Sequence, residues 1–157
     1  MNQPKEGKGD IRQILSDLVE KSGVLTAMLI SKEGVSITEA GDTSYLNTTA
    51  MAALVAGMFS ATREVARMVG EKQFSILLQQ GENRHIHISL VHDSKMMVIV
   101  FEDYQRIGLV RHEARKSGEA ISNVLARCDK PEGAEEIATP QFKEYALNLI
   151  DRIFQTK

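Results

Sequence analysis

The sequence predicts an α/β (α+β) domain in which helices cover both faces of a five-stranded, mostly antiparallel sheet. Two observations favour this fold: residues 47–70 have the pattern of one long helix, and five shorter segments have the apolar or alternating patterns of strands. The expected order of elements is α-β-β-α-β-β-β-α. With 157 residues, 43% of them hydrophobic and 25% charged, the chain can bury one sizeable core.

The N-terminal part should supply one helix and one hairpin. Residues 1–9 are polar and contain glycine and proline, so we predict a disordered tail there. A helix with a regular apolar stripe is expected to start at Asp10 and to end before Gly23. Residues 24–31 are almost wholly apolar, which is typical of a central strand. After a tight turn, alternating residues 35–40 predict a second strand that pairs with the first.

The long helix has recognisable ends and little charge between them. Asn47 can cap its first turn, and Gly70 suits the left-handed residue that closes a helix. The bulky side chains expected to lie on the sheet are Met51, Leu54, Val55, Met58, Val65 and Met68. A second row has no bulk and contains Ala53, Gly57 and Ser60. Such a row favours either close packing inside one protomer or a docking face for a second protein, and helix geometry alone leaves both open.

The second half of the sheet should be a three-stranded meander. Short turns separate the predicted strands at 74–80, 84–91 and 95–102. The last of them is continuously apolar, so it should be central and lie beside the first strand of the chain. The strand at 74–80 would then be an edge strand although it carries apolar side chains, which invites pairing with a second copy. The residues expected in that dimer interface are Phe74, Ile76 and Leu78.

The C-terminal part should hold a third helix over residues 107–128, completing a domain of residues 10–128. Residues 129–139 contain proline, glycine and several acids, and are predicted to be a linker. An amphipathic helix is expected over residues 140–157. The apolar residues with which it would contact a partner are Phe142, Leu149, Ile150, Ile153 and Phe154.

Composition argues against several classes of function. A net charge of −2 and the lack of Trp disfavour nucleic-acid binding. Cys128 is the only cysteine, so an intramolecular disulfide is excluded and a reducing compartment is favoured. The first residues do not resemble a signal peptide, and no apolar run is long enough to cross a bilayer. We therefore expect a cytoplasmic protein that is not inserted in a membrane.

Catalytic interpretations of the sequence are weaker than a binding role. His85 and His87 alternate along one strand, and His92 follows, which could seed a metal site, but polar residues on a half-exposed strand face are the simpler explanation. No phosphate-binding loop or nucleophile motif is present. The arginines that could act as a finger on phosphate are better explained as surface charge, and they are Arg63, Arg67, Arg106 and Arg111. We therefore predict no catalytic residue, metal or cofactor.

Several segments, taken in order, resemble the roadblock family and most of all its bacterial MglB branch. The resemblance covers about residues 10–127 and extends to the C-terminal helix. It is carried by Gly34 in the first hairpin, by the run from Asn47-Thr48-Thr49 to Ala56-Gly57, by Val69-Gly70-Glu71, and by Ile107-Gly108-Leu109-Val110-Arg111.

The resemblance implies a roadblock-type fold and a homodimer whose edge strands join into one sheet, with the two long helices on one face. It also implies a small Ras-like GTPase of the MglA kind as partner, whose GTP hydrolysis is stimulated because its switch segments become ordered, in cell polarity and motility. The partner-binding residues would be Ala53, Gly57, Ser60, Arg63, Glu64 and Arg67. The alternative is a structural dimerisation scaffold of the same family that does not affect nucleotide turnover.

Overall fold

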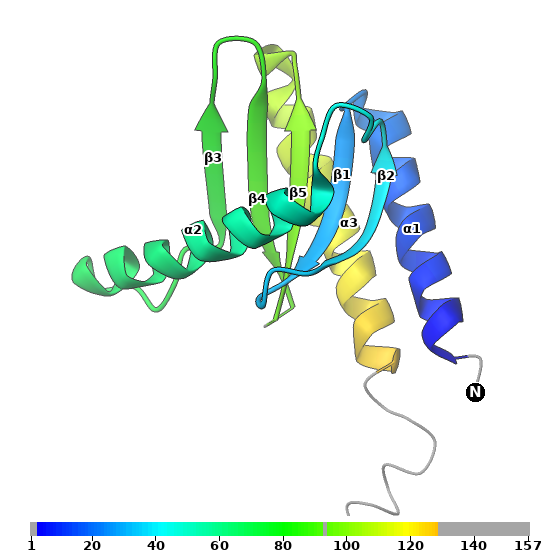
Figure 1. The fold of residues 1–157 in the computed structure, drawn as a ribbon, viewed down its shortest axis with the longest axis horizontal. Helices are drawn as coiled ribbons and strands as arrows, with labels where there is room; N and C mark the ends of the chain where they lie inside the picture. Colours follow the sequence, from blue (N-terminus) through cyan, green and yellow to red (C-terminus); the bar gives the residue numbers. More distant parts are fainter. Residues whose placement is uncertain (1–2, 93, 129–157) are drawn as a thin grey trace, which may run out of the picture. The chain divides into compact units, whose positions relative to one another are not determined.

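The structure is a computed structural model that describes residues 3–92 and 94–128. Within these residues the elements follow the predicted order (Figure 1). Their bounds are α1 Gln3–Ser22, β1 Thr26–Ser31, β2 Ser36–Gly41, α2 Thr48–Met68, β3 Ile76–Gln80, β4 His85–Val91, β5 Lys95–Phe101, the 3-10 turn η1 Tyr104–Arg106 and α3 Ile107–Cys128. The chain divides into two compact units, residues 1–125 and 126–157, and the fold described below is that of the first.

The strands form one sheet in the order β2-β1-β5-β4-β3, and every neighbouring pair is antiparallel. The two most apolar strands, β1 and β5, are adjacent and internal, as the sequence predicts. Their register places Thr26 opposite Val100. The edges are β2 and β3, so the prediction that the 74–80 segment forms an edge strand is confirmed.

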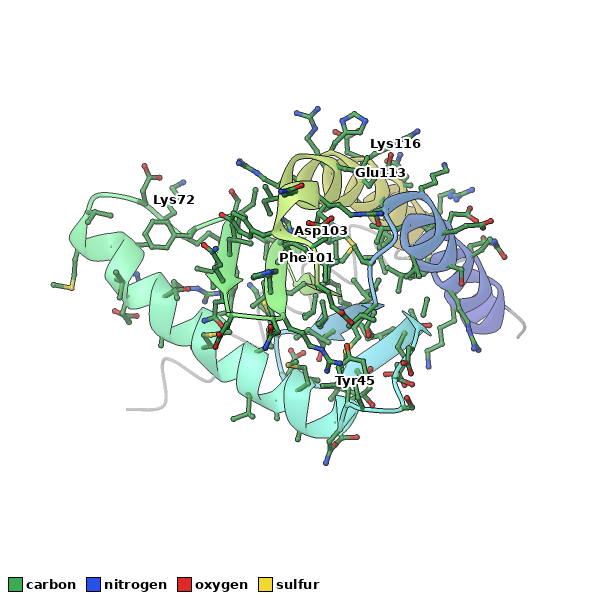
Figure 2. The ribbon with its side chains drawn as sticks, turned by 90° about the horizontal axis from the view of Figure 1, so that it is seen from above. Tyr45, Lys72, Phe101, Asp103, Glu113 and Lys116 are labelled. Atoms are coloured by element: carbon green, nitrogen blue, oxygen red, sulfur yellow. The ribbon has the colours of Figure 1, made fainter. Side chains whose placement is uncertain are left out.

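Helices cover both faces of this sheet. Helix α2 crosses one face, and α1 and α3 lie on the other (Figures 1 and 2). Side chains that alternate along β1 enter two separate cores: Met28 and Ile30 join α2, whereas Ala27 and Leu29 join α1 and α3. Because β1 is buried on both faces, its sequence is continuously apolar rather than alternating.

Helix α1 begins earlier than predicted. It starts at Gln3, so the expectation of a disordered tail is wrong for residues 3–9, and Asp10 lies inside the helix instead of at its start. Pro4 is in the first turn, where a helix needs no N–H donor, and this position makes proline compatible with the helix. Composition alone suggests that residues 3–9 are not helical, because glycine and proline are unfavourable inside helices.

Both ends of α2 are closed as predicted. The Asn47 side chain accepts a hydrogen bond of 3.0 Å from the Ala50 N–H. At the other end, Gly70 has a φ of +86°, and the Glu71 N–H donates to the Ala66 carbonyl at 2.9 Å. This pattern is a Schellman motif, in which a left-handed glycine lets the chain turn back on the last carbonyls.

The prediction of which α2 side chains lie on the sheet is only partly right. Val55 is buried, and Met51 and Met58 are half-buried against the same core. Leu54 and Met68, however, are 72% and 86% exposed, and Val65 is exposed as well. The residues that α2 buries are mostly small, and they are Ala52, Val55, Ala56, Phe59 and Ala66.

The predicted linker at 129–139 and the predicted C-terminal helix at 140–157 lie outside the described residues. Among the residues that the structure describes, no helix is long and apolar enough to cross a membrane.

Candidate protein-binding site

Helix α2 presents three different sides along its length. One side packs on the sheet, as described above. With about 100° of rotation per residue, Leu54, Ala61, Val65 and Met68 fall together on a second side, which we call the apolar stripe. The third side carries Ala53, Gly57, Ser60, Glu64 and Arg67 at alternating spacings of four and three residues, and we call it the small-residue row. All residues of the stripe and of the row are exposed.

Packing within the protomer does not explain why position 57 of the small-residue row is a glycine. A Cβ atom built on Gly57 would meet no atom within 4 Å. A larger residue would fit there, and it would improve helix propensity by up to about 1 kcal/mol. Of the two explanations that the sequence left open, close packing inside one protomer therefore fails at this position.

Ala53, at the start of the row, also has a role inside the protomer. Gly34, in the turn of the β1-β2 hairpin, has a φ of +88°, and a Cβ there would lie 3.0 Å from the Ala53 Cα. The hairpin turn thus packs directly on the first turns of α2. This contact positions the start of the row while leaving the Ala53 side chain exposed.

The far end of the row is charged. Arg67 Nη1 lies 3.0 Å from Glu64 Oε1, and both side chains are largely exposed, so the pair contributes roughly 0.2–1 kcal/mol at most. Arg63, which the resemblance placed in the partner-binding set, is half-buried instead of exposed. Its Nε has no hydrogen-bond partner among the described residues. The row therefore changes along its length from small and neutral to charged.

The apolar stripe lies on a side of α2 that the sequence does not predict to be free. Leu54, Val65 and Met68 are all large hydrophobic side chains that remain more than half exposed. Single exposed apolar residues are ordinary, but a line of them on one helix indicates a contact surface. The sequence contains the signal, because these residues repeat at helical spacing, but such spacing alone favours a side that faces the sheet.

Edge strand β3 carries the second exposed apolar surface. Ile76 and Leu78 are 43% and 38% exposed, and their pairing with Ser89 and His87 places them on the α3 face of the sheet. Phe74 is half-buried and precedes the strand, so it is not one of the residues of β3. The outer edge of β3 pairs with no strand among the described residues.

The histidines of β4 point to one face, as predicted, but they are not on a half-exposed surface. His85 is buried, and its ring centroid lies 5.2 Å from that of Phe101 and 5.1 Å from that of Tyr104. His87 is 1% exposed. No group of three His, Cys, Asp or Glu side chains suited to a metal occurs in the part of the chain that the structure describes.

Arg106 holds two elements together. Its Nη1 donates to the Ser22 carbonyl at 3.1 Å, and its Nε lies 3.6 Å from Asp103 Oδ2. These contacts link η1 to the end of α1, so the guanidinium supports the fold instead of being held ready for a phosphate. Cys128 is exposed at the last residue of α3.

Comparison with known proteins places this arrangement in a family. Residues 10–101 match the model of the Roadblock/LC7 domain. The chain belongs to the Roadblock/LC7 family. Among curated proteins, none matched the roadblock chain significantly.

Solved structures with the same fold include bacterial MglB proteins. Myxococcus xanthus MglB superposes on this roadblock domain with a TM-score of 0.75 and 24% identity, covering 78% of this chain and 92% of that one. The gliding protein MglB of Thermus thermophilus superposes with a TM-score of 0.71 and 22% identity, covering 75% of this chain and 90% of that one. A structure described as MglB with tetrameric arrangement superposes with a TM-score of 0.73 and 21% identity, covering 78% of this chain and 92% of that one. At these identities the likeness establishes a shared fold.

Proposed function

We propose that this roadblock protein is a homodimer that binds a small Ras-like GTPase through the small-residue row of α2 and stimulates its GTP hydrolysis. The observation that carries the proposal is that α2 exposes two separate surfaces, the apolar stripe and the small-residue row. Packing inside the protomer does not require a glycine at position 57 of this row. Two surfaces suit two partners, a second copy of the chain and a different protein.

The apolar stripe is the surface that suits the second copy. In a symmetric dimer, Leu54, Val65 and Met68 of one α2 would meet the same residues of the other, which removes their apolar area from water. Pairing through the outer edge of β3 would at the same time satisfy its free backbone groups and join the two sheets. Helix α2 crosses the sheet toward β3, so its C-terminal end lies on the same side of the domain as that edge (Figure 1).

The small-residue row would remain accessible in such a dimer. It lies about 100° around the helix from the apolar stripe, so covering the stripe does not cover the row. Small side chains let a partner backbone approach closely, and Glu64 and Arg67 at the charged end can select among partners through their fixed charges. The chain is proposed to act by holding the switch segments of the GTPase in order, while the GTPase supplies the catalytic groups. We also propose that it acts in the cytoplasm.

The substitution Gly57→Arg tests this assignment. The side chain has room in the free protomer, so the protein should fold and dimerise. In a complex, however, its length and charge would have to be buried against the partner, and we expect at least a tenfold loss of affinity for the GTP-loaded GTPase. Stimulation of GTP hydrolysis should be lost in parallel, as measured by phosphate release from Ras-like GTPases purified from the same cells.

Gly9→Arg is the matched control. Gly9 is also an exposed helical glycine, and a Cβ atom built on it would meet no atom within 4 Å, but it lies on α1. The Gly9→Arg substitution should leave GTPase binding and the stimulation of GTP hydrolysis unchanged. Full stimulation by Gly57→Arg would show that the docking surface is elsewhere. If the unmodified protein binds the GTPase without changing hydrolysis, the scaffold function of the family is the correct one.

A further inference from the structure

A groove on the other face of the sheet is not explained by the proposed GTPase function. It has a volume of about 710 Å³ and runs between α3 and the neighbouring strands β3 and β4. The part of α3 that lines it contains the small residues Gly108, Ala114 and Gly118 between longer polar side chains. A Cβ on Gly118 would lie only 3.6 Å from Val91, which shows how closely the helix approaches β4 at one end of the groove.

Two polar side chains of β4 line this groove and lack hydrogen-bond partners within the described residues. Both ring nitrogens of His87 and the hydroxyl of Ser89 are buried in this unsatisfied state. An unpaired buried polar group is unfavourable by about 1–3 kcal/mol, so a pair of them lining one hollow indicates that a partner comes from outside the fold. A neutral imidazole has one N–H donor, and the serine hydroxyl is a second donor.

The wall formed by α3 supplies positive charge. Arg111 and Arg115 line the groove one helical turn apart, so they lie on the same side of α3. Glu119 is the one carboxylate among the described lining residues, which leaves the arginines in excess. Guanidinium groups bind carboxylate and phosphate groups through two parallel hydrogen bonds. Ile76 and Val91 contribute apolar side chains to the lining.

We propose that this groove binds a small organic anion. Its carboxylate or phosphate group would be held by Arg111 and Arg115, with His87 and Ser89 as further donors, and its apolar part would lie against Ile76 and Val91. Burial, and secondarily the positive charge of Arg111, lower the pKa of the His87 imidazole. His87 would therefore act as a neutral hydrogen-bonding group, while the arginines supply the charge. The site is independent of α2, and its ligand would bind whether or not the GTPase assignment is correct.

The test uses the full-length protein labelled with ¹⁵N and titrated with phenyl phosphate, which combines an anionic group with an apolar ring. We expect saturable changes in the NMR signals of residues 85–91 and 108–122 and of the His87 ring nitrogens at millimolar concentration or below. Benzoate in place of phenyl phosphate tells whether a carboxylate or a phosphate is preferred. Benzyl alcohol has a similar ring without the charge and should bind at least tenfold more weakly.

Three variants separate specific binding from general charge attraction. The double variant Arg111→Gln with Arg115→Gln should weaken phenyl phosphate binding at least tenfold. Lys8→Gln with Arg12→Gln, which removes two exposed positive charges from α1, should leave it unchanged. His87→Leu should also weaken binding while maintaining or raising the melting temperature, because it replaces unpaired polar atoms with apolar ones.

Three results would overturn the proposal. The first is that phenyl phosphate causes no saturable change in the groove signals. The second is that the double variant in α1 loses as much affinity as the double variant in α3, so that only net charge matters. The third is that benzyl alcohol binds as well as phenyl phosphate, which would make the groove an apolar site without preference for anions.

Discussion

His87 lies on β4 with its imidazole enclosed between the sheet and α3, and this environment changes its acid-base behaviour. Burial, and secondarily the positive charge of Arg111, lower the pKa of His87 below its ordinary value. Both effects disfavour the protonated ring. In the unfolded chain the same imidazole would titrate near pH 6.5, roughly the ordinary value for histidine. The folded protein therefore resists a proton that the unfolded chain accepts.

This difference predicts a loss of stability in mild acid. As the pH falls through the unfolded pKa of His87 toward its lower folded pKa, the unfolded state binds more protons, so the free energy of unfolding should decrease. His87→Leu should reduce this dependence between about pH 7 and pH 5, as measured by chemical denaturation at several pH values. His112→Leu, which removes an exposed imidazole from α3, is the control. The same pH dependence in the His87 variant would contradict the argument.

At the scale of the elements, α2 depends on its closed ends. Asn47 and the Schellman motif at Gly70 satisfy backbone groups that would otherwise be exposed at the two ends of the helix. This matters for more than local stability, because the apolar stripe and the small-residue row both depend on one uninterrupted helix from Thr48 to Met68.

Removing the N-terminal cap should therefore be measurable. Asn47→Ala deletes the oxygen that accepts from the Ala50 N–H at 3.0 Å, and we expect the free energy of unfolding to fall by about 0.5–2 kcal/mol. Asn47→Asp retains an acceptor and should retain most of the stability. Thermal unfolding followed by circular dichroism measures both. If the alanine and aspartate variants behave alike, the side-chain oxygen does not stabilise the helix.

The edge strand β3 is the second element with a specific consequence. Its exposed apolar side chains, Ile76 and Leu78, lie on one face, next to a backbone edge that no other described strand pairs with. Lysine at an edge strand opposes pairing with another chain, because its charge would have to be desolvated in the new interface. The proposed dimer should therefore be sensitive to charge at these two positions.

We expect Ile76→Lys combined with Leu78→Lys to raise the dimer dissociation constant at least tenfold in sedimentation velocity experiments. Val35→Lys is the matched control, since Val35 is also an exposed apolar residue but precedes β2 at the opposite edge. The control should sediment like the unmodified protein. If the unmodified chain is a monomer at micromolar concentration, the proposed dimer does not exist.

At the scale of the whole molecule, the described residues form two cores, one on each face of the sheet. The buried apolar residues run from Ile11 to Val124, and helices cover both faces of the sheet. Residues 129–157 lie outside the described part. The amphipathic helix predicted there has an apolar side of its own, and we propose that this side contacts the GTPase.

Deletion of residues 129–157 should then change the melting temperature by no more than a few degrees while it weakens binding of the GTPase or alters its nucleotide exchange. In the full-length chain, Leu149→Asp with Ile153→Asp should have the same effect on binding, whereas Asn148→Asp should not. A large drop in melting temperature with unchanged GTPase binding would assign the segment to the fold itself.

Local patterns in the sequence determined much of this fold. The order of elements, the bounds of the third helix at Ile107 and Cys128, and both ends of α2 were predictable because capping residues and helical or strand periodicity act over a few positions. The central location of β1 and β5 was also predictable, since only strands covered on both faces are continuously apolar. Membership of the roadblock family followed from the same segments taken in order.

Tertiary structure decided the features that depend on partners distant in sequence. The sequence could not tell which side of α2 faces the sheet, because bulky and small residues alternate around that helix, and the small ones, such as Ala52 and Ala56, form the close contact. It also could not show that His87 is buried, since alternation along β4 gives a shared face but not what covers it. The groove is lined by α3 on one side and by β3 and β4 on the other, and these residues are far apart in the chain.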